Sequence, residues 1–266
     1  MNVYVGPIPI GRTDYEITVG WQTKANSTQF TAVVNIRVTA ATGAAREGLT
    51  GTIKASCKSP CTATGKAQGP MSAAGQEWAP ATIVFKDAVA KDQIHISSPQ
   101  FELTPTHPSR GIGKSQVWGT FNPVRCDDTM GNSQNAGCIM KKHQPIMTSM
   151  VELPQIAANI ARIQAGLGGL GKPGGGAPLH RLKDEAMHRT NYEAVCGRAV
   201  AGPAPPGMSC DEYPFASASE GGRRVWGTTQ AWGWVPASEQ NQQGGRINAF
   251  YTQNRVLDSD SFWVRV

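Results

Sequence analysis

The strongest constraint on the fold of this chain is a change in the spacing of its apolar residues. Along residues 30–38 every second residue is apolar. This period of two is typical of a strand with one buried face. From about residue 146 the spacing lengthens to that of a helix, with isoleucines at 156, 160 and 163. The two patterns predict a β-rich part followed by a part of mixed structure.

Further strand candidates and dense turns extend the first pattern. The candidates are Tyr15–Trp21, Thr82–Phe85, Gln93–Ile96, Phe101–Thr104 and Gln116–Phe121. Glycine and proline together make 48 of the 266 residues, so long helices are few and turns are frequent. Short strands separated by turn residues favour a sandwich or barrel. We therefore predict an α+β protein: an all-β, sandwich-like accessory domain over residues 1–140 and a small α+β domain over residues 141–266.

The second part shows helix signals at both of its ends. Pro154 can occupy the first turn of a helix that continues through the isoleucines. Residues 166–176 hold seven glycines, which predict a loop or a mobile lid. A short polar helix is expected over residues 184–195, and the proline-rich residues 202–207 cannot be helical.

Six cysteines occur as three pairs that are close in sequence: Cys57 with Cys61, Cys126 with Cys138, and Cys196 with Cys210. Such pairs predict disulfides and an oxidising compartment, with metal binding as the alternative. Zinc-site spacing and neighbouring histidines are absent, which disfavours metal. No apolar run is long enough to span a membrane, and no signal peptide follows Met1. We expect a secreted chain whose targeting segment has been removed.

One stretch near the end of the chain is rich in chemically active side chains. It reads Cys-Asp-Glu-Tyr-Pro-Phe-Ala-Ser at 210–217, and a run with a Glu, carboxamides and two flexible glycines follows at 235–245. Pro214 disfavours helical backbone at Tyr213, so the residues before it should be extended. Neighbouring side chains of an extended segment point to opposite faces. Asp211 and Glu212 should therefore do different jobs, one facing a site and the other braced.

These residues resemble the NucA/NucB family of secreted bacterial deoxyribonucleases. The resemblance is carried by residues 210–217, by Glu-Gly-Gly at 220–222, by the Glu-x-Asn-x-Gln-Gly-Gly pattern at 239–245, and by the tail from Phe250 to Val264. It covers roughly residues 145–266. We identify no family resemblance before residue 145.

The resemblance implies a metal-dependent endonuclease that hydrolyses phosphodiester bonds of DNA, with RNA as an open alternative. It implies that Asp211 and Glu212 are catalytic and bind the metal, with Asn241 as a carboxamide ligand and Glu220 and Glu239 at motif positions. A hard cation, Mg²⁺ or Mn²⁺, suits such oxygen ligands. A histidine is a common base in metal nucleases, and His180 is the candidate we select, while His188 stays ambiguous.

Cations and amides around the motif are candidates for binding the substrate. Nine of the eleven cationic residues after position 144 are arginines, which grip phosphate in a bidentate fork. The candidates are Arg181, Arg223, Arg224, Gln243 and Arg246. The chain departs from the family pattern in two places. Gln240 stands where a second asparagine is common, so the amide ligand can shift by one residue. Asn191-Tyr192 replaces Asn-Arg, which removes one phosphate contact.

Two functions of different classes fit these observations. The first is an extracytoplasmic nuclease, acting as a secreted toxin and paired with a cognate inhibitor protein. The second is a non-catalytic protein that binds a surface or ligand and retains a decayed nuclease domain. The net charge of +6 is modest for this length and does not separate them.

Overall fold

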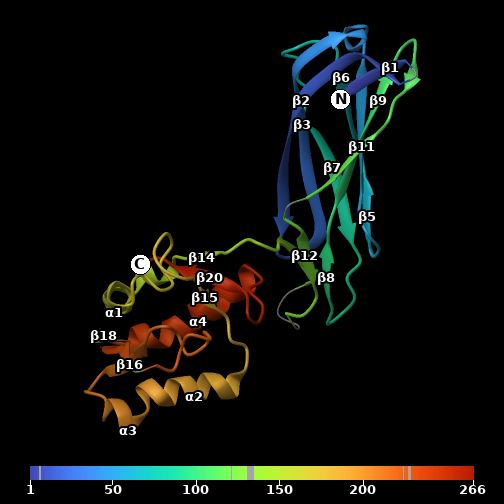
Figure 1. Cartoon of the computed structure of the whole chain (residues 1–266). Helices are drawn as coiled ribbons and strands as arrows, with labels where there is room; N and C mark the ends of the chain where they lie inside the picture. Colours follow the sequence, from blue (N-terminus) through green and yellow to red (C-terminus); the bar gives the residue numbers. More distant parts are fainter. Residues whose placement is uncertain (6, 121, 131–134, 224, 227–228) are drawn as a thin grey trace. The chain divides into compact units, whose positions relative to one another are not determined.

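The computed structural model describes residues 1–5, 7–120, 122–130, 135–223, 225–226 and 229–266 (Figure 1). The chain divides into two compact units, Met1–Lys142 and His143–Val266, and each is described by itself. Among the residues that the structure describes, the first unit consists of strands with one short 3-10 helix, and the second combines helices with short strands. This content confirms the predicted α+β class.

The first unit is built on two sheets that share one core. The strand orders are β1-β2-β3-β7-β5 and β10-β9-β4-β6, with β11 added beside β9. A small third sheet has the order β13-β12-β8. The bounds are β1 Asn2–Val5, β2 Ile8–Lys24, β3 Ser27–Gly43, β4 Thr50–Ser56, β5 Cys61–Thr64, β6 Lys66–Pro70, β7 Ala81–Asp87, β8 Ile94–Ser97, β9 Gln100–His107, β10 Gly111–Ile112, β11 Gln116–Gly119, β12 Val124–Asp127 and β13 Gly137–Met140, with a 3-10 helix at Ala44–Arg46.

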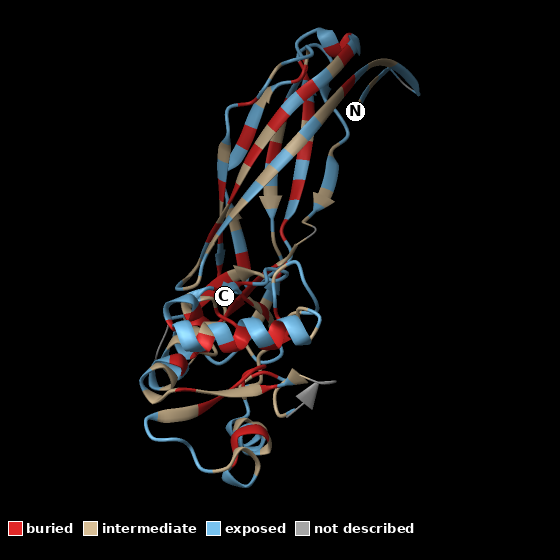
Figure 2. Ribbon diagram, turned by 90° about the vertical axis from the view of Figure 1, so that its left-hand side faces the viewer, coloured by how far each residue is buried: buried red, intermediate tan, exposed pale blue. Residues whose placement is uncertain are grey.

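Each predicted strand is confirmed, but β8 begins one residue later than predicted, at Ile94, and β11 ends at Gly119. Phe121, the last residue of the prediction for β11, lies outside the described residues. The apolar row along residues 30–38 forms the buried face of β3, which pairs with β2 and β7. Figure 2 shows the resulting alternation of buried and exposed residues along the long strands. Strands β4 and β6 escaped the sequence analysis because glycine, threonine and lysine dilute their apolar pattern.

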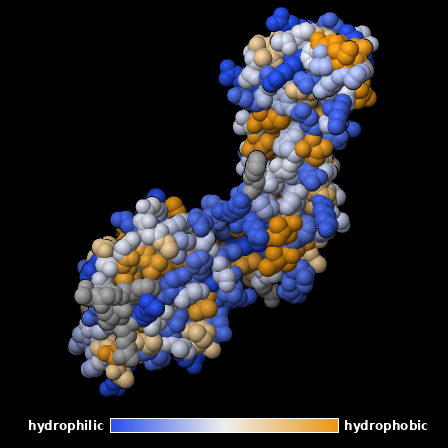
Figure 3. Space-filling model, viewed as in Figure 1, coloured by the Kyte–Doolittle hydropathy of each residue, from blue (hydrophilic) through white to orange (hydrophobic). Residues whose placement is uncertain are grey.

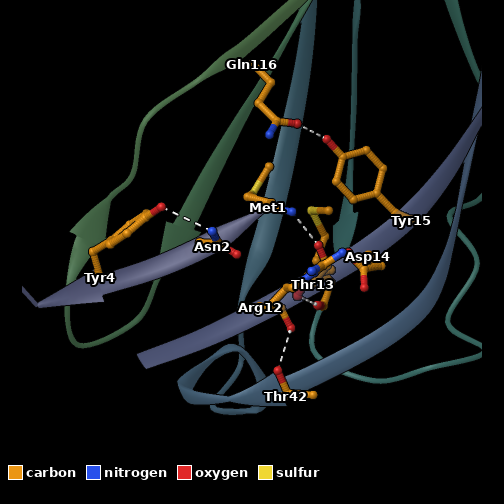
Figure 4. A network of polar contacts seen from close by, with 10 residues as sticks. Met1, Asn2, Tyr4, Arg12, Thr13, Asp14, Tyr15, Thr42 and Gln116 are labelled. Atoms are coloured by element: carbon orange, nitrogen blue, oxygen red, sulfur yellow. Dashed lines mark hydrogen bonds and ion pairs between the residues drawn. The ribbon is translucent and has the colours of Figure 1, made fainter. Parts of the chain in front are cut away.

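Backbone and side-chain bonds hold the N-terminus against the long hairpin of the first unit. The Met1 amino group donates to the carbonyl of Thr13 at 2.6 Å, and the Thr13 N–H donates to the carbonyl of Met1 at 2.8 Å (Figure 4). The hydroxyl of Tyr15 bonds the side chain of Gln116 on β11. Figure 3 shows hydrophobic patches on the surface of each unit.

The described part of the second unit packs four α-helices around short strands. A three-stranded sheet has the order β14-β20-β15, and β16 pairs with β19 in a separate antiparallel ladder. The bounds are β14 Ile146–Met147, a 3-10 helix at Ser149–Glu152, α1 Pro154–Gly166, β15 Leu179–His180, α2 Glu185–Cys196, α3 Arg198–Ala201, β16 Met208–Glu212, β17 Val225–Trp226, β18 Thr229–Gln230, β19 Trp232–Pro236, α4 Ala237–Gln253 and β20 Ser261–Val264.

The expected helix after Pro154 and the polar helix before Cys196 are both confirmed as α1 and α2. The carboxylate of Asp184 caps α2 by accepting the N–H groups of Ala186 and Met187. The prediction of a flexible run at residues 235–245 is wrong. Most of it forms the first turns of α4, which buries one face in the core of this unit. Packing of that face outweighs the cost of its two glycines, about 1 kcal/mol each.

All three predicted disulfides are present: Cys57–Cys61, Cys126–Cys138 and Cys196–Cys210. Three bridges fit an extracellular protein. The second bridge joins directly opposed residues of β12 and β13, and the third ties the end of α2 to β16. No helix formed by the described residues has the length and apolar character needed to cross a membrane.

Candidate active site

The register of the β16–β19 ladder decides where the two motif acids point. Asp211 lies opposite Gly233, and Glu212 lies opposite Trp232. Because adjacent residues of a strand face opposite sides, the two carboxylates occupy different environments. Asp211 faces α1 and α4, and Glu212 faces α2.

Asp211 is fully buried and braced by two amides. The Nδ2 of Asn159 on α1 donates to Oδ2 at 2.8 Å and to the Asp211 carbonyl at 3.0 Å. The Nε2 of Gln243 on α4 donates to Oδ1 at 2.7 Å. Burial raises the pKa of Asp211 to about 6, while the two amide bonds act in the opposite direction. Asp211 is thus a fixed anchor between two helices.

Arg162 fixes the orientation of the Asn159 amide. Its Nη2 donates to Oδ1 of Asn159 at 2.7 Å, and the guanidinium also donates to the carbonyls of Gln230 and Trp232, each at 3.0 Å. Gly233 leaves room for this contact, because a Cβ there would lie 2.7 Å from Oδ1 of Asn159. The sequence analysis missed Asn159. The available signal was an amide within the isoleucine face of α1.

Glu212 lines a cleft of about 260 Å³ in the second unit. Its Oε1 accepts the N–H of Ala216 at 3.2 Å, and its Oε2 lies 3.5 Å from the bridged Sγ of Cys196. Burial, followed by the charge of Asp211, raises the pKa of Glu212 to about 8. The cleft is lined by Arg181, His188, Glu212, Phe215, Ala216, Ser217, Gln240, Gln243, Gly244, Ile247, Asn248 and Tyr251.

A histidine and an arginine share this cleft with Glu212. The Nε2 of His188 lies 2.5 Å from the carbonyl of Leu182, so this nitrogen carries a proton and Nδ1 is the acceptor of the neutral ring. The guanidinium of Arg181 lies 4.6 Å from the ring centroid of Tyr251 and donates to the carbonyl of Val256. The arrangement places a base, a cation and a carboxyl group around one hollow.

Three of the other predicted site residues make structural contacts outside this cleft. His180 and Glu220 bond each other, with 2.7 Å between Nδ1 and Oε1, and Glu220 also accepts the His180 N–H at 3.0 Å. Glu239 accepts the N–H groups of Gln155 and Ile156 at 3.0 and 3.1 Å, so it caps the start of α1.

The helical geometry of α4 sorts the remaining candidates. Gln240 and Gln243 line the cleft, but Asn241 is exposed on another face of the helix and does not. Arg246 pairs with Glu152, with 2.6 Å between Nη1 and Oε2. Arg223 is exposed and outside the cleft lining, and Arg224 lies outside the described residues.

A small α+β unit with a high-pKa carboxyl group, an imidazole and a guanidinium in one cleft has the equipment of a hydrolase. Residues 180–265 match the family described as Deoxyribonuclease NucA/NucB. The match confirms the resemblance and supports a nuclease with a nucleic-acid substrate. It includes every residue that lines the cleft and begins after α1. Searches of curated proteins and of solved structures found no match for the chain.

Proposed function

We propose that the second unit is an extracytoplasmic, metal-dependent endonuclease that hydrolyses phosphodiester bonds of DNA. The observation that carries the proposal is the position of Glu212, a buried carboxyl group beside His188 and Arg181 in a cleft of the family-matched region. The three disulfides support an oxidising location. A toxin role and a cognate inhibitor stay predictions.

The donors of the cleft suit a divalent cation that keeps several waters. No group of three or more His, Cys, Asp or Glu that could hold a metal occurs among the described residues. Magnesium needs fewer, because it binds through one or two carboxylates together with substrate phosphates and water. Glu212 and the amide oxygens of Gln240 or Asn248 would hold it. When bound, the cation would neutralise phosphate charge and steady the leaving oxygen.

The remaining chemistry follows from the side chains themselves. A water attacks phosphorus, and Nδ1 of His188 takes its proton as the new P–O bond forms. The bond to the leaving oxygen breaks, and that oxygen takes a proton from solvent. Arg181 meets the charge that builds on the phosphate oxygens. Asp211 positions the Gln243 amide at the wall of the cleft and does not contact substrate.

Plasmid nicking tests the proposal. The parent should nick supercoiled DNA with Mg²⁺ or Mn²⁺ and stop on addition of a chelator. His188→Asn should lose about 10²–10⁴-fold in rate, as is typical for a lost general base. His143→Asn, an exposed histidine outside the cleft, is the matched control. His180→Asn should retain most activity. A severe loss there with an active His188→Asn would overturn the assignment of the base.

A further inference from the structure

A second hollow of about 460 Å³ lies in the nuclease-like unit beside the Cys196–Cys210 bridge. Small-molecule sites in proteins fall in the same range, roughly 300–1,000 Å³. Its walls combine two aromatic rings with apolar and polar groups. The principal side chains are Tyr192, Glu193, Arg198, Met208, Ser209 and Trp234.

Helix α2 lines both the second hollow and the cleft. His188, Tyr192 and Cys196 are spaced four residues apart on α2, so they form one row along the helix. His188 lines the cleft, and the other two line the second hollow. One turn of helix, about 5.4 Å, separates neighbours in this row. A chain of nucleotides bound in the cleft therefore has a second recess within one nucleotide of it.

The opposite wall belongs to the β16–β19 ladder. Cys210 lies opposite Trp234 and Glu212 lies opposite Trp232, so these four side chains share one face of the ladder. The rings of Trp232 and Trp234 meet edge to face, with 5.4 Å between centroids. The bridge lies between the two recesses, since Sγ of Cys196 is 3.5 Å from Oε2 of Glu212.

Tyr192 is the side chain that points to a ligand. It is 37% exposed, and no described residue bonds its hydroxyl, so its packing alone does not require a tyrosine. Arg198 is exposed at the rim of the same hollow. Aromatic faces next to a cation are the combination that binds unpaired nucleic-acid bases, because every base offers a π-face and carries a phosphate beside it.

We propose that this hollow binds an unpaired base of the nucleotide next to the scissile phosphate, stacked on Tyr192 with Arg198 near its phosphate. The inference rests on the proposed nuclease function, because it places the scissile phosphate in the cleft at Glu212. Stacking needs a base that has left the duplex. The enzyme should accordingly favour single-stranded or locally opened substrate.

A scan with abasic oligonucleotides tests the subsite. Short single-stranded substrates carry one abasic position, moved stepwise past the cleavage site, and kcat/KM is measured for each. One position next to the scissile phosphate should lower kcat/KM by roughly 5- to 150-fold, the range for one stacked base. Tyr192→Ala should remove this discrimination and Tyr192→Phe should keep it. Met187→Ala, an exposed residue of the same helix, is the control. A flat scan with an active parent overturns the subsite.

A binding measurement separates this inference from the proposed function. An oligonucleotide with 2-aminopurine at successive positions is titrated into the Glu212→Gln protein, which should bind without cutting. Stacking should quench fluorescence at one position, and Tyr192→Ala in the same background should abolish the quench. Quenching by a protein whose parent never cleaves would refute the nuclease and support the subsite. Cleavage by the parent with no Tyr192-dependent quench would do the reverse.

Discussion

Glu212→Gln should stabilise the metal-free protein at alkaline pH while it removes activity. The pKa of Glu212 is raised from an ordinary value of 4.5 to about 8, so the folded state binds this proton more tightly than the unfolded state does. The stability due to that proton is complete below about pH 4.5 and is lost as the pH rises through 8. At pH 8 the loss is about 4 kcal/mol, from 1.36 kcal/mol per pKa unit.

The substitution removes this titration and keeps an oxygen to accept the Ala216 N–H. The difference in free energy of unfolding between variant and parent should grow from near zero at pH 4 to at most about 4 kcal/mol at pH 8. For a unit of this length that is a rise in Tm of about 15 °C, at about 4 °C per kcal/mol.

Circular dichroism at 222 nm in a chelator is a suitable assay, since the described α-helices all lie in the second unit. Glu193→Gln, on the exposed side of α2, is the matched control. The difference in Tm between this variant and the parent should stay constant with pH. A difference in Tm between the parent and Glu212→Gln that stays constant from pH 4 to 8 would refute the reasoning. It would mean that the carboxyl group is hydrated in solution.

Three other predictions concern the braced acid, the two amides and the first unit. Asp211→Asn should lower kcat by at most about 10²-fold, because it disturbs the Gln243 amide at the wall of the cleft and not Glu212 or His188; nicking rates that fall as far as those of Glu212→Gln would contradict this. Gln240→Ala should raise the Mg²⁺ concentration for half activity, and Asn241→Ala should not; a magnesium titration that moved only with the second change would reverse the assignment. A folded fragment that begins at His143 should cut DNA at a rate comparable with the whole chain, and an inert fragment would show that the β-rich unit completes the site.

Local patterns predicted the fold well where a single element carries its own signal. The alternation along residues 30–38 marks β3, Asp184 marks the start of α2, and Pro214 marks the extended end of β16. Each signal lies within a few residues of the structure that it specifies. Helix α4 was hidden because its support is the buried face of Gln243, Ile247 and neighbouring aromatics, and that face depends on residues distant in sequence.

The sequence analysis predicted the region of the candidate site, but only the fold shows which residues of that region line the cleft. The motif acids were found, and the ladder then placed Glu212 in the cleft and Asp211 behind it. His180 is adjacent to Arg181, and adjacent residues of an extended segment face opposite ways. Only Arg181 reaches the cleft, and the histidine there is His188, which comes from a helix. The distance of His180 and His188 from the motif in sequence does not show which of the two reaches the cleft.

Helix α1 lies outside the region that matches the family but supplies part of the core of the second unit. Its isoleucines at 156, 160 and 163 are fully buried in the core of the second unit, yet the matched region begins at residue 180. Burying three such side chains contributes about 5–9 kcal/mol, comparable with the whole stability of a typical domain. A fragment that begins at residue 180 would lose the Asn159 amide that braces Asp211 and also the part of the core that α1 supplies.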